Sequence, residues 1–251
     1  MRLMARITTA LCFFWLPLSV QAEEILIAVA SNFSAPMAEI IGHFEAATGN
    51  KVNMSVGASG RFFAQISNGA PFQLFFSADQ DKPQRLEEAG LTVPGSRFTY
   101  AIGRLVLWSA DEELLEENTE VLYTDKFQRL ALANPRLAPY GQAAVEVLQE
   151  LNLVERTQSR WVMGENIAQT YQFVESGNAD LGFVALSQVS GAQGFIKGSG
   201  WILPGNLYAA LRQDAVILRP GQDCQACQQF MVFMQTLQVR QVIENYGYLI
   251  N

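Results

Sequence analysis

Residues 25–44 read ILIAVASNFSAPMAEIIGHF and join three signals of local structure in one stretch. The first six residues are an unbroken apolar run, which is typical of a strand buried on both faces of a parallel sheet. Residues 31–36 form a polar turn, in which serine and asparagine are favoured helix N-caps and proline fits the first helical turn. Apolar residues then recur at the spacing of an amphipathic helix, at Met37, Ile40, Ile41 and Phe44. The stretch therefore predicts a strand, a polar turn and a helix.

The same alternation continues through residue 86. Residues 52–56 alternate as a second strand, and the turn at 57–60 opens a helix that ends near Gly69. A third strand at 72–76 leads through a turn at 77–80 into another helix. Such a β-α-β-α-β unit forms a parallel sheet with right-handed crossovers, and its ligands bind at the carboxyl ends of the strands.

A second α/β series begins at residue 130. Its predicted strands lie at 130–133, 161–163 and 181–185, with helices between them. The run 207–218 can carry the chain back, so that a C-terminal helix over 230–246 packs on the first half. We therefore expect an α/β protein of two lobes, each a mostly parallel sheet flanked by helices, with a hinged cleft between them. Lobe 1 comprises residues 23–103 and 213–251, and lobe 2 comprises residues 104–212.

Composition narrows the function. The chain has 251 residues, of which 24 are acidic, 17 are basic and only one, His43, is histidine. This length allows two lobes of about 100 to 120 residues each. A charged share of 16% is below the ordinary value of about a quarter, and no polar tract dominates, so bulk disorder is not expected. The single histidine excludes a histidine-rich zinc site.

Residues 1–22 have the pattern of a secretory signal peptide. Arg2 and Arg6 precede a mostly apolar stretch at 9–20, and Ala22 provides a small residue for cleavage before two glutamates. An uncleaved anchor is the alternative, but the stretch is short for a spanning helix. Cleavage would remove Cys12 and leave 15 basic against 24 acidic residues, a net charge of −9. We expect a periplasmic protein that binds no nucleic acid, because such binding needs clustered cations.

Three strand-to-helix turns are polar but uncharged. They lie at residues 31–32, 57–60 and 139–141. The free N–H groups and the macrodipole at a helix start favour an anion, and serine hydroxyls can donate as well. Each turn alone is equally consistent with an ordinary helix cap. Together, at the end of the sheet where ligands gather, they predict an anion site.

Two other kinds of chemistry compete with this interpretation. Ser59 follows a strand as the nucleophile of a serine hydrolase does, but the spacing is G-x-S-G, and His43 precedes the serine against the hydrolase chain order. Cys224 and Cys227 form a C-x-x-C pair, which in an exported protein predicts a local disulfide. A thiol-redox pair is the alternative, although that motif normally follows the first strand of its fold. We expect neither an enzyme nor a bound cofactor.

Several motifs resemble one protein family over nearly the whole chain after the leader. They are residues 27–33 (IAVASNF), 56–60 (VGASG), 68–79 (NGAPFQLFFSAD), 130–135 (LALANP), 138–141 (APYG), 164–167 (GENI), 181–184 (LGFV) and 244–248 (ENYGY). These motifs are similar to those of the molybdate-binding periplasmic proteins of ABC transporters. The resemblance implies a type II periplasmic binding protein, with the oxyanion in the cleft and an ABC permease as its partner.

The resemblance also implies a ligand shell. The family's positions match Ser31 with its neighbour Asn32, Ser59, Tyr140 and the backbone N–H of Ile167. Many relatives carry a ligand-binding tyrosine where Ala185 stands here, so we expect Tyr140 to supply the phenol. The implied ligand is molybdate, with tungstate as a second cargo, no further metal, and a monomeric protein. The alternative within this class is a receptor for another oxyanion or a small organic acid.

Overall fold

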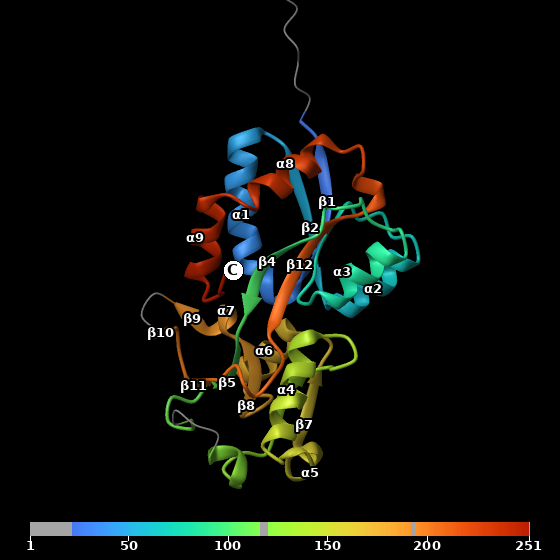
Figure 1. The fold of residues 1–251 in the computed structure, drawn as a ribbon. Helices are drawn as coiled ribbons and strands as arrows, with labels where there is room; N and C mark the ends of the chain where they lie inside the picture. The colour runs from blue at the N-terminus through green and yellow to red at the C-terminus, as the bar shows by residue number, and fades with distance from the viewer. Residues whose placement is uncertain (1–21, 116–119, 192–193, 251) are drawn as a thin grey trace, which may run out of the picture.

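The computed structural model describes residues 22–115, 120–191 and 194–250 (Figure 1). The predicted signal peptide lies outside these residues except for Ala22, as does Cys12. The described residues form two α/β lobes, each built on a five-stranded sheet, as expected from the sequence. No helix in the described ranges is both long and apolar enough to span a membrane.

Lobe 1 contains the sheet with the strand order β2-β1-β3-β12-β4. Its first three strands, β2 (Lys51–Gly57), β1 (Glu24–Ala30) and β3 (Leu74–Phe76), are parallel. The strand β12 (Leu211–Ile217) runs antiparallel between β3 and β4 (Phe98–Gly103). The parallel strands β1–β3 belong to the predicted β-α-β-α-β unit, whereas β4 and β12 lie next to the two segments that connect the lobes.

Helices cover both faces of the lobe 1 sheet. On one face lie α1 (Ser34–Thr48), α8 (Gln225–Phe233) and α9 (Leu237–Asn245), whose apolar side chains pack on Ile25, Ile27 and Val29. On the other face lie α2 (Ser59–Ser67) and α3 (Asp81–Glu88), which pack around Ala28 and Phe75. The side chains of β1 thus alternate between two buried faces, which explains its unbroken apolar sequence.

The expectation of one C-terminal helix over 230–246 is wrong. The structure has two helices there, α8 and α9, with a break at residues 234–236. Thr236 is the N-cap of α9, and its hydroxyl oxygen accepts a hydrogen bond from the Val239 N–H at 3.4 Å. A threonine that caps a new helix explains why the apolar pattern does not form a single rod.

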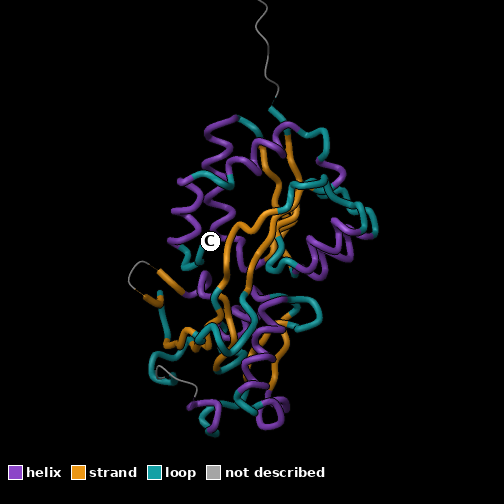
Figure 2. The backbone as a smooth tube through the Cα atoms, in the orientation of Figure 1, coloured by secondary structure: helices purple, strands orange, loops and turns teal. Residues whose placement is uncertain are grey.

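Lobe 2 contains the sheet with the strand order β11-β5-β8-β6-β7. Figure 2 shows its strands in orange in the lower half of the molecule. The parallel strands are β8 (Leu181–Ala185), β6 (Leu130–Ala133) and β7 (Trp161–Gly164). The strand β5 (Leu105–Ser109) runs antiparallel between β8 and β11 (Ser199–Ile202). The longer helices are α4 (Pro139–Glu150) and α6 (Ile167–Glu175), and the shorter ones are α5 (Val154–Thr157) and α7 (Leu186–Val189). A small ladder joins β9 (Ser190–Gly191) and β10 (Gly194–Phe195).

Two segments connect the sheets. Arg104 alone separates β4 of lobe 1 from β5 of lobe 2, and residues 203–210 lead from β11 back to β12. Because β4 and β12 are paired, the two connections begin side by side. The residue boundaries given above for the lobes stay a prediction. The turns after β1, β2, β6 and β7 all lie where the two lobes meet.

Candidate functional site

A small pocket lies between the lobes at the carboxyl ends of the parallel strands. All five predicted site residues line it, and so do seven others: Ala30, Gly57, Ala58, Ala78, Ala138, Pro139 and Asn166. The space free of protein atoms is about 180 Å³, including solvent at the mouth. So little free space suits only a very small ligand.

The N-terminus of α6 presents a free backbone donor to the pocket. Asn166 caps this helix, and its side-chain oxygen accepts hydrogen bonds from the N–H groups of Ala168 and Gln169 at 3.0 and 3.1 Å. The first helical residue, Ile167, is buried and lines the pocket, and its N–H makes no hydrogen bond within the described chain. The cap thus leaves the Ile167 N–H as the donor available to a ligand.

The N-terminus of α4 presents a second donor from lobe 2. Pro139 is the first helical residue and has no N–H, so the first N–H of the helix belongs to Tyr140. The next two, from Gly141 and Gln142, both reach the carbonyl oxygen of Ala138. The Tyr140 N–H has no such partner in the described chain and lies at the pocket wall.

Lobe 1 contributes side-chain hydroxyls. Ser59 is 1% exposed at the start of α2, and its hydroxyl oxygen accepts a hydrogen bond from the Ala78 N–H at 2.9 Å. One of the two lone pairs of this hydroxyl is therefore used, and its proton remains for another partner. The Ser31 hydroxyl is buried beside the pocket and makes no hydrogen bond within the described residues.

The Asn32 side chain is hydrogen-bonded within the protein. Its amide donates to the Gln213 side-chain oxygen at 2.8 Å and to the Tyr248 hydroxyl at 3.0 Å. The backbone carbonyl oxygen of Asn32 accepts hydrogen bonds from the hydroxyls of Ser187 and Tyr248. Asn32 therefore connects the turn after β1 to lobe 2 through Ser187. Of its hydrogen-bond donors, only the backbone N–H remains free for the pocket.

The Tyr140 phenol is also used within the protein. Its hydroxyl oxygen accepts a hydrogen bond from the Gln213 side-chain nitrogen at 3.3 Å, and the same hydroxyl also interacts with the Tyr248 phenol. The other end of Gln213, its oxygen, accepts from Asn32 and from the Tyr100 hydroxyl. Gln213 is fully buried at the start of β12 and so joins ligand turns of both lobes. Burial raises the pKa of Tyr140 and of Tyr100 well above the usual value, because it disfavours the phenolate.

Gly103 makes room for this phenol. A Cβ at this position would lie 2.1 Å from the Tyr140 hydroxyl oxygen and 2.6 Å from the Gln213 side-chain nitrogen. Gly103 and Gln213 have no signal in the sequence, because nothing in their local pattern indicates that the Tyr140 ring reaches them. Only the pairing of β4 with β12 beside α4 brings the three together.

The electrostatics of the pocket come from backbone and hydroxyl dipoles. None of the described residues that line it is an aspartate, glutamate, lysine or arginine. Arg61, the one cation in the lobe 1 ligand turns, forms an ion pair with Glu165 of lobe 2 at the rim. The starts of α4 and α6 from lobe 2 meet the start of α2 and the 3₁₀ turn Ser31–Phe33 from lobe 1, and the positive ends of the helix dipoles favour an anion.

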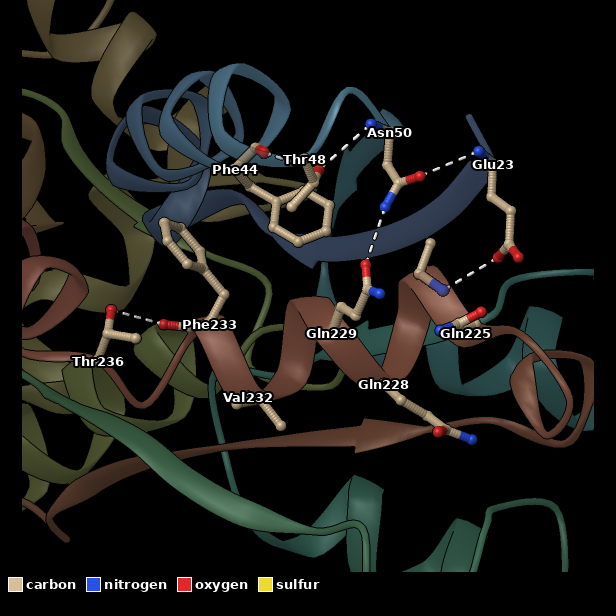
Figure 3. A pocket seen from close by; sticks show the side chains of 11 residues that line it. Glu23, Phe44, Thr48, Asn50, Gln225, Gln228, Gln229, Val232, Phe233 and Thr236 are labelled. Atoms are coloured by element: carbon tan, nitrogen blue, oxygen red, sulfur yellow. Dashed lines mark hydrogen bonds between the residues drawn. The ribbon is translucent and has the colours of Figure 1, made fainter. Parts of the chain in front are cut away.

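A much larger pocket lies elsewhere, on lobe 1 between α1 and α8. It has about 1,400 Å³ free of protein atoms and is lined mainly by amide and apolar side chains. Figure 3 shows Asn50 bonded to both Glu23 and Gln229, which joins α8 to the start of the chain. Neither lobe 2 nor any predicted site residue contributes to it, so its size alone does not make it the ligand site.

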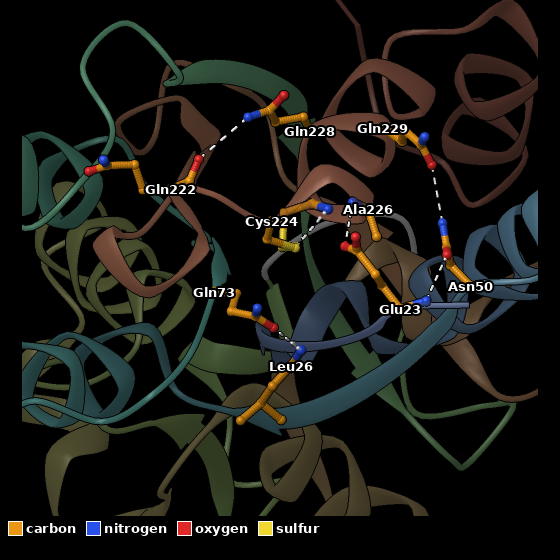
Figure 4. The surroundings of a disulfide bond; sticks show 10 residues. Glu23, Leu26, Asn50, Gln73, Gln222, Cys224, Ala226, Gln228 and Gln229 are labelled. Carbon is orange, nitrogen blue, oxygen red and sulfur yellow. Dashed lines mark hydrogen bonds between the residues drawn. A yellow bond between two sulfur atoms is a disulfide. The ribbon is translucent and has the colours of Figure 1, made fainter. Parts of the chain in front are cut away.

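The predicted disulfide between Cys224 and Cys227 is present, with a Cα–Cα distance of 5.3 Å. Cys224 caps α8, and the Glu23 carboxylate accepts a hydrogen bond from the Ala226 N–H at 3.0 Å in the same turn (Figure 4). A carboxylate at this helix start disfavours a second anion there, so it opposes formation of a reactive thiolate. The surroundings suit a structural bridge.

No hydrolase triad or metal cluster forms among the described residues. His43 is half-exposed on α1 and lies 3.9 Å from Glu39, and no hydrogen bond joins it to Ser59. In the described ranges no group of three or more histidine, cysteine, aspartate or glutamate side chains could hold a metal ion.

A small pocket between two α/β lobes, lined by helix starts and hydroxyls, defines a bilobal binding protein for a small ligand. The chain belongs to the family of bacterial extracellular solute-binding proteins, whose family model matches residues 25–249. This family binds solutes, so the protein is a binding protein and not an enzyme.

Individual relatives are similar over nearly the whole chain. The molybdate-binding protein ModA of Azotobacter vinelandii is 49% identical over 245 residues, which are 98% of this chain and 97% of the relative. ModA of Rhodobacter capsulatus is 44% identical over 93% of this chain and 91% of its own. A solved periplasmic molybdate-binding protein of A. vinelandii superposes with a TM-score of 0.88 at 40% identity, over 90% of this chain and 99% of that one. The family recognised from the sequence motifs is confirmed.

Proposed function

We propose that the protein is a periplasmic receptor that captures molybdate between its lobes and delivers it to an ABC permease. The observation that carries the proposal is the pocket lined by free helix N–H groups and hydroxyls, with no charged side chain. The names of the two ModA relatives and of the superposed structure support molybdate as the ligand.

The proposed shell has donors from both lobes. Ser31, Asn32 and Ser59 act from lobe 1, Asn32 through its backbone N–H. Tyr140 and Ile167 donate from lobe 2 through their backbone N–H groups. A dianion that is fully deprotonated near neutral pH offers only acceptors, so a shell of donors suits it. Burial between the lobes strengthens each of these hydrogen bonds.

Protonated oxyanions fit this pocket less well. Phosphate keeps a proton near neutral pH and needs an acceptor for it, yet no carboxylate lines the pocket. The Ser59 oxygen already accepts from Ala78. Tungstate offers the same charge and shape as molybdate, so we propose it as a second ligand. Sulfate is smaller, and its discrimination rests on how tightly the lobes close.

Closure is proposed to occur about the two connections, Arg104 and residues 203–210. The lobes are then residues 23–103 with 213–251 and residues 104–212, after removal of the leader 1–22. The structure has the lobes in contact, since the Gly60 N–H donates to the Leu137 carbonyl oxygen at 2.8 Å. Opening breaks this contact and exposes the donors to solvent.

Isothermal titration calorimetry of the chain from Glu23 onward tests the proposal. Molybdate and tungstate should bind with a 1:1 stoichiometry, and sulfate and phosphate should bind at least tenfold more weakly. Binding of sulfate or phosphate alone would overturn the assignment of the ligand. Small-angle scattering with and without molybdate should show a smaller radius of gyration in the complex.

A further inference from the structure

Arg61 and Glu165 form an ion pair that crosses from one lobe to the other. Arg61 lies in the first turn of α2, two residues after Ser59, and Glu165 lies in the turn between β7 and α6, two residues before Ile167. Their side chains are 56% and 44% exposed. The pair therefore lies at the solvent-facing rim, and each partner is next to a proposed ligand donor of its own lobe.

The pair belongs to a set of contacts that hold the lobes together. Beside Arg61, the Gly60 N–H bonds to Leu137 of lobe 2, and a Cβ at Gly60 would lie 2.8 Å from the Leu137 carbonyl oxygen. Deeper in the interface, the Ser187 hydroxyl donates to the Asn32 carbonyl oxygen at 2.9 Å. The ion pair is the contact of this set that consists of two full charges and can be altered at the surface without disturbing buried packing.

We propose that Arg61 acts twice, first by attracting the anion to the open cleft and then by closing the cleft through its bond to Glu165. The inference rests on the proposed function, because it concerns the capture and release of that anion. When the lobes are closed, the charges of Arg61 and Glu165 offset each other, and the ligand is bound by the neutral donors of the pocket. When the lobes separate, the guanidinium is left without Glu165 beside the Ser59 turn.

The two charges have opposite effects on association and the same effect on dissociation. A cation at the rim raises the rate at which an anion arrives, and an acid lowers it, each in a manner that salt screens. Removing either partner breaks the same bond across the cleft, so dissociation becomes faster in both cases. Exposed ion pairs contribute about 0.2–1 kcal/mol, which corresponds to a change of about 1.4- to fivefold in rate.

Other charged residues near the rim do not replace this pair. Lys82 is held by Asp79 within lobe 1, and Arg136 is exposed in the turn before α4 of lobe 2. The ion pair of Arg61 and Glu165 joins the two lobes, whereas that of Lys82 and Asp79 lies within lobe 1. Both neighbours stay unchanged in the variants below, so they affect all rates alike.

Stopped-flow tryptophan fluorescence with molybdate measures both rates for the variants Arg61→Gln and Glu165→Gln. Both should dissociate about two- to fivefold faster than the parent protein. At low ionic strength the association rate should fall in Arg61→Gln and rise in Glu165→Gln, and high salt should remove this difference. Lys51→Gln and Glu45→Gln make the same charge changes at an ion pair within lobe 1 and should leave dissociation unchanged.

The double variant Arg61→Glu with Glu165→Arg restores the ion pair with the acidic residue in lobe 1 and the basic residue in lobe 2. Its dissociation rate should return to within about twofold of the parent value, whereas Arg61→Glu alone dissociates faster. Unchanged dissociation in both single variants, or association rates that shift in the same direction, would overturn the inference while leaving molybdate binding intact. Failure of the parent protein to bind molybdate would overturn the proposed function and the inference with it.

Discussion

Lobe 1 and lobe 2 offer chemically different donors to one pocket. From lobe 1 come the hydroxyls of Ser31 and Ser59, which a single substitution can remove, together with the backbone N–H of Asn32. From lobe 2 come the backbone N–H groups of Tyr140 and Ile167, which persist whatever side chain those residues carry. Binding should therefore depend most on side-chain identity in lobe 1, and most on helix geometry and on the residues that hold the helix starts in place in lobe 2.

We expect the largest effect on affinity from a substitution at Gly103, which makes room for the Tyr140 hydroxyl. Gly103→Ala places a Cβ 2.1 Å from the Tyr140 hydroxyl oxygen, so the start of α4 must shift. Overpacking of this kind costs about 1–3 kcal/mol, and we expect the upper end, with about a hundredfold loss of affinity. Calorimetry and thermal unfolding measure both effects.

Gly42 provides the matched control for this substitution. It lies inside α1, and a Cβ there meets no atom within 4 Å. Gly42→Ala should leave affinity unchanged and stabilise the fold by about 0.5–1 kcal/mol, because glycine is unfavourable within a helix. Equal losses of affinity in both variants would show that Tyr140 is not positioned through Gly103.

The next effect tests a lobe 1 hydroxyl. Ser59→Ala removes the proposed donor and should weaken binding by about 1–3 kcal/mol. Tyr140→Phe is the contrasting variant, because its lost hydroxyl bonds to Gln213 and not to the ligand in our proposal. It should lower stability by leaving the Gln213 N–H unsatisfied, with less than a fivefold change in affinity. A larger loss of affinity in Tyr140→Phe than in Ser59→Ala would contradict the assignment of backbone donors to lobe 2.

A smaller effect is expected from the cap of α6. Asn166→Ala leaves the N–H groups of Ala168 and Gln169 without their cap and should cost about 1 kcal/mol of stability. Affinity should fall by severalfold, because the Ile167 N–H is no longer held in place. Asn166→Asp keeps a capping oxygen and should retain stability, but its added charge beside the anion should weaken binding. Hydrogen exchange at α6 separates loss of the cap from repulsion.

The smallest effect concerns pH. Among the residues that the structure describes, no carboxylate, histidine or amine lines the pocket, so affinity should stay within about twofold between pH 6 and 9. The raised pKa values of Tyr100 and Tyr140 mean that the unfolded chain releases their protons first. The stability they contribute is therefore complete below about pH 10 and is lost as pH rises further. Denaturant unfolding from pH 7 to 11 measures this loss, and a steep change in affinity near pH 7 would contradict the neutral shell.

Much of the site could be predicted from local sequence. The three polar turns that open helices lie at the carboxyl ends of strands, and the structure brings them to one pocket with Ile167. The role expected of the Tyr140 phenol could not be judged from sequence, because the ring's direction depends on the space at Gly103. Gln213 was missed for the same reason, since its partners lie 73, 113 and 181 residues away along the chain.

The sequence by itself determined the α/β class, the strand-to-helix turns and the family, because these depend on periodicity and on motifs that are local in the chain. Tertiary structure alone decided which polar groups remain free at the pocket. A side chain such as Asn32 or Tyr140 can donate to a ligand or to a neighbour, and the choice depends on distances between segments far apart in sequence. Those distances are set when the paired strands β4 and β12 bring the two lobes together.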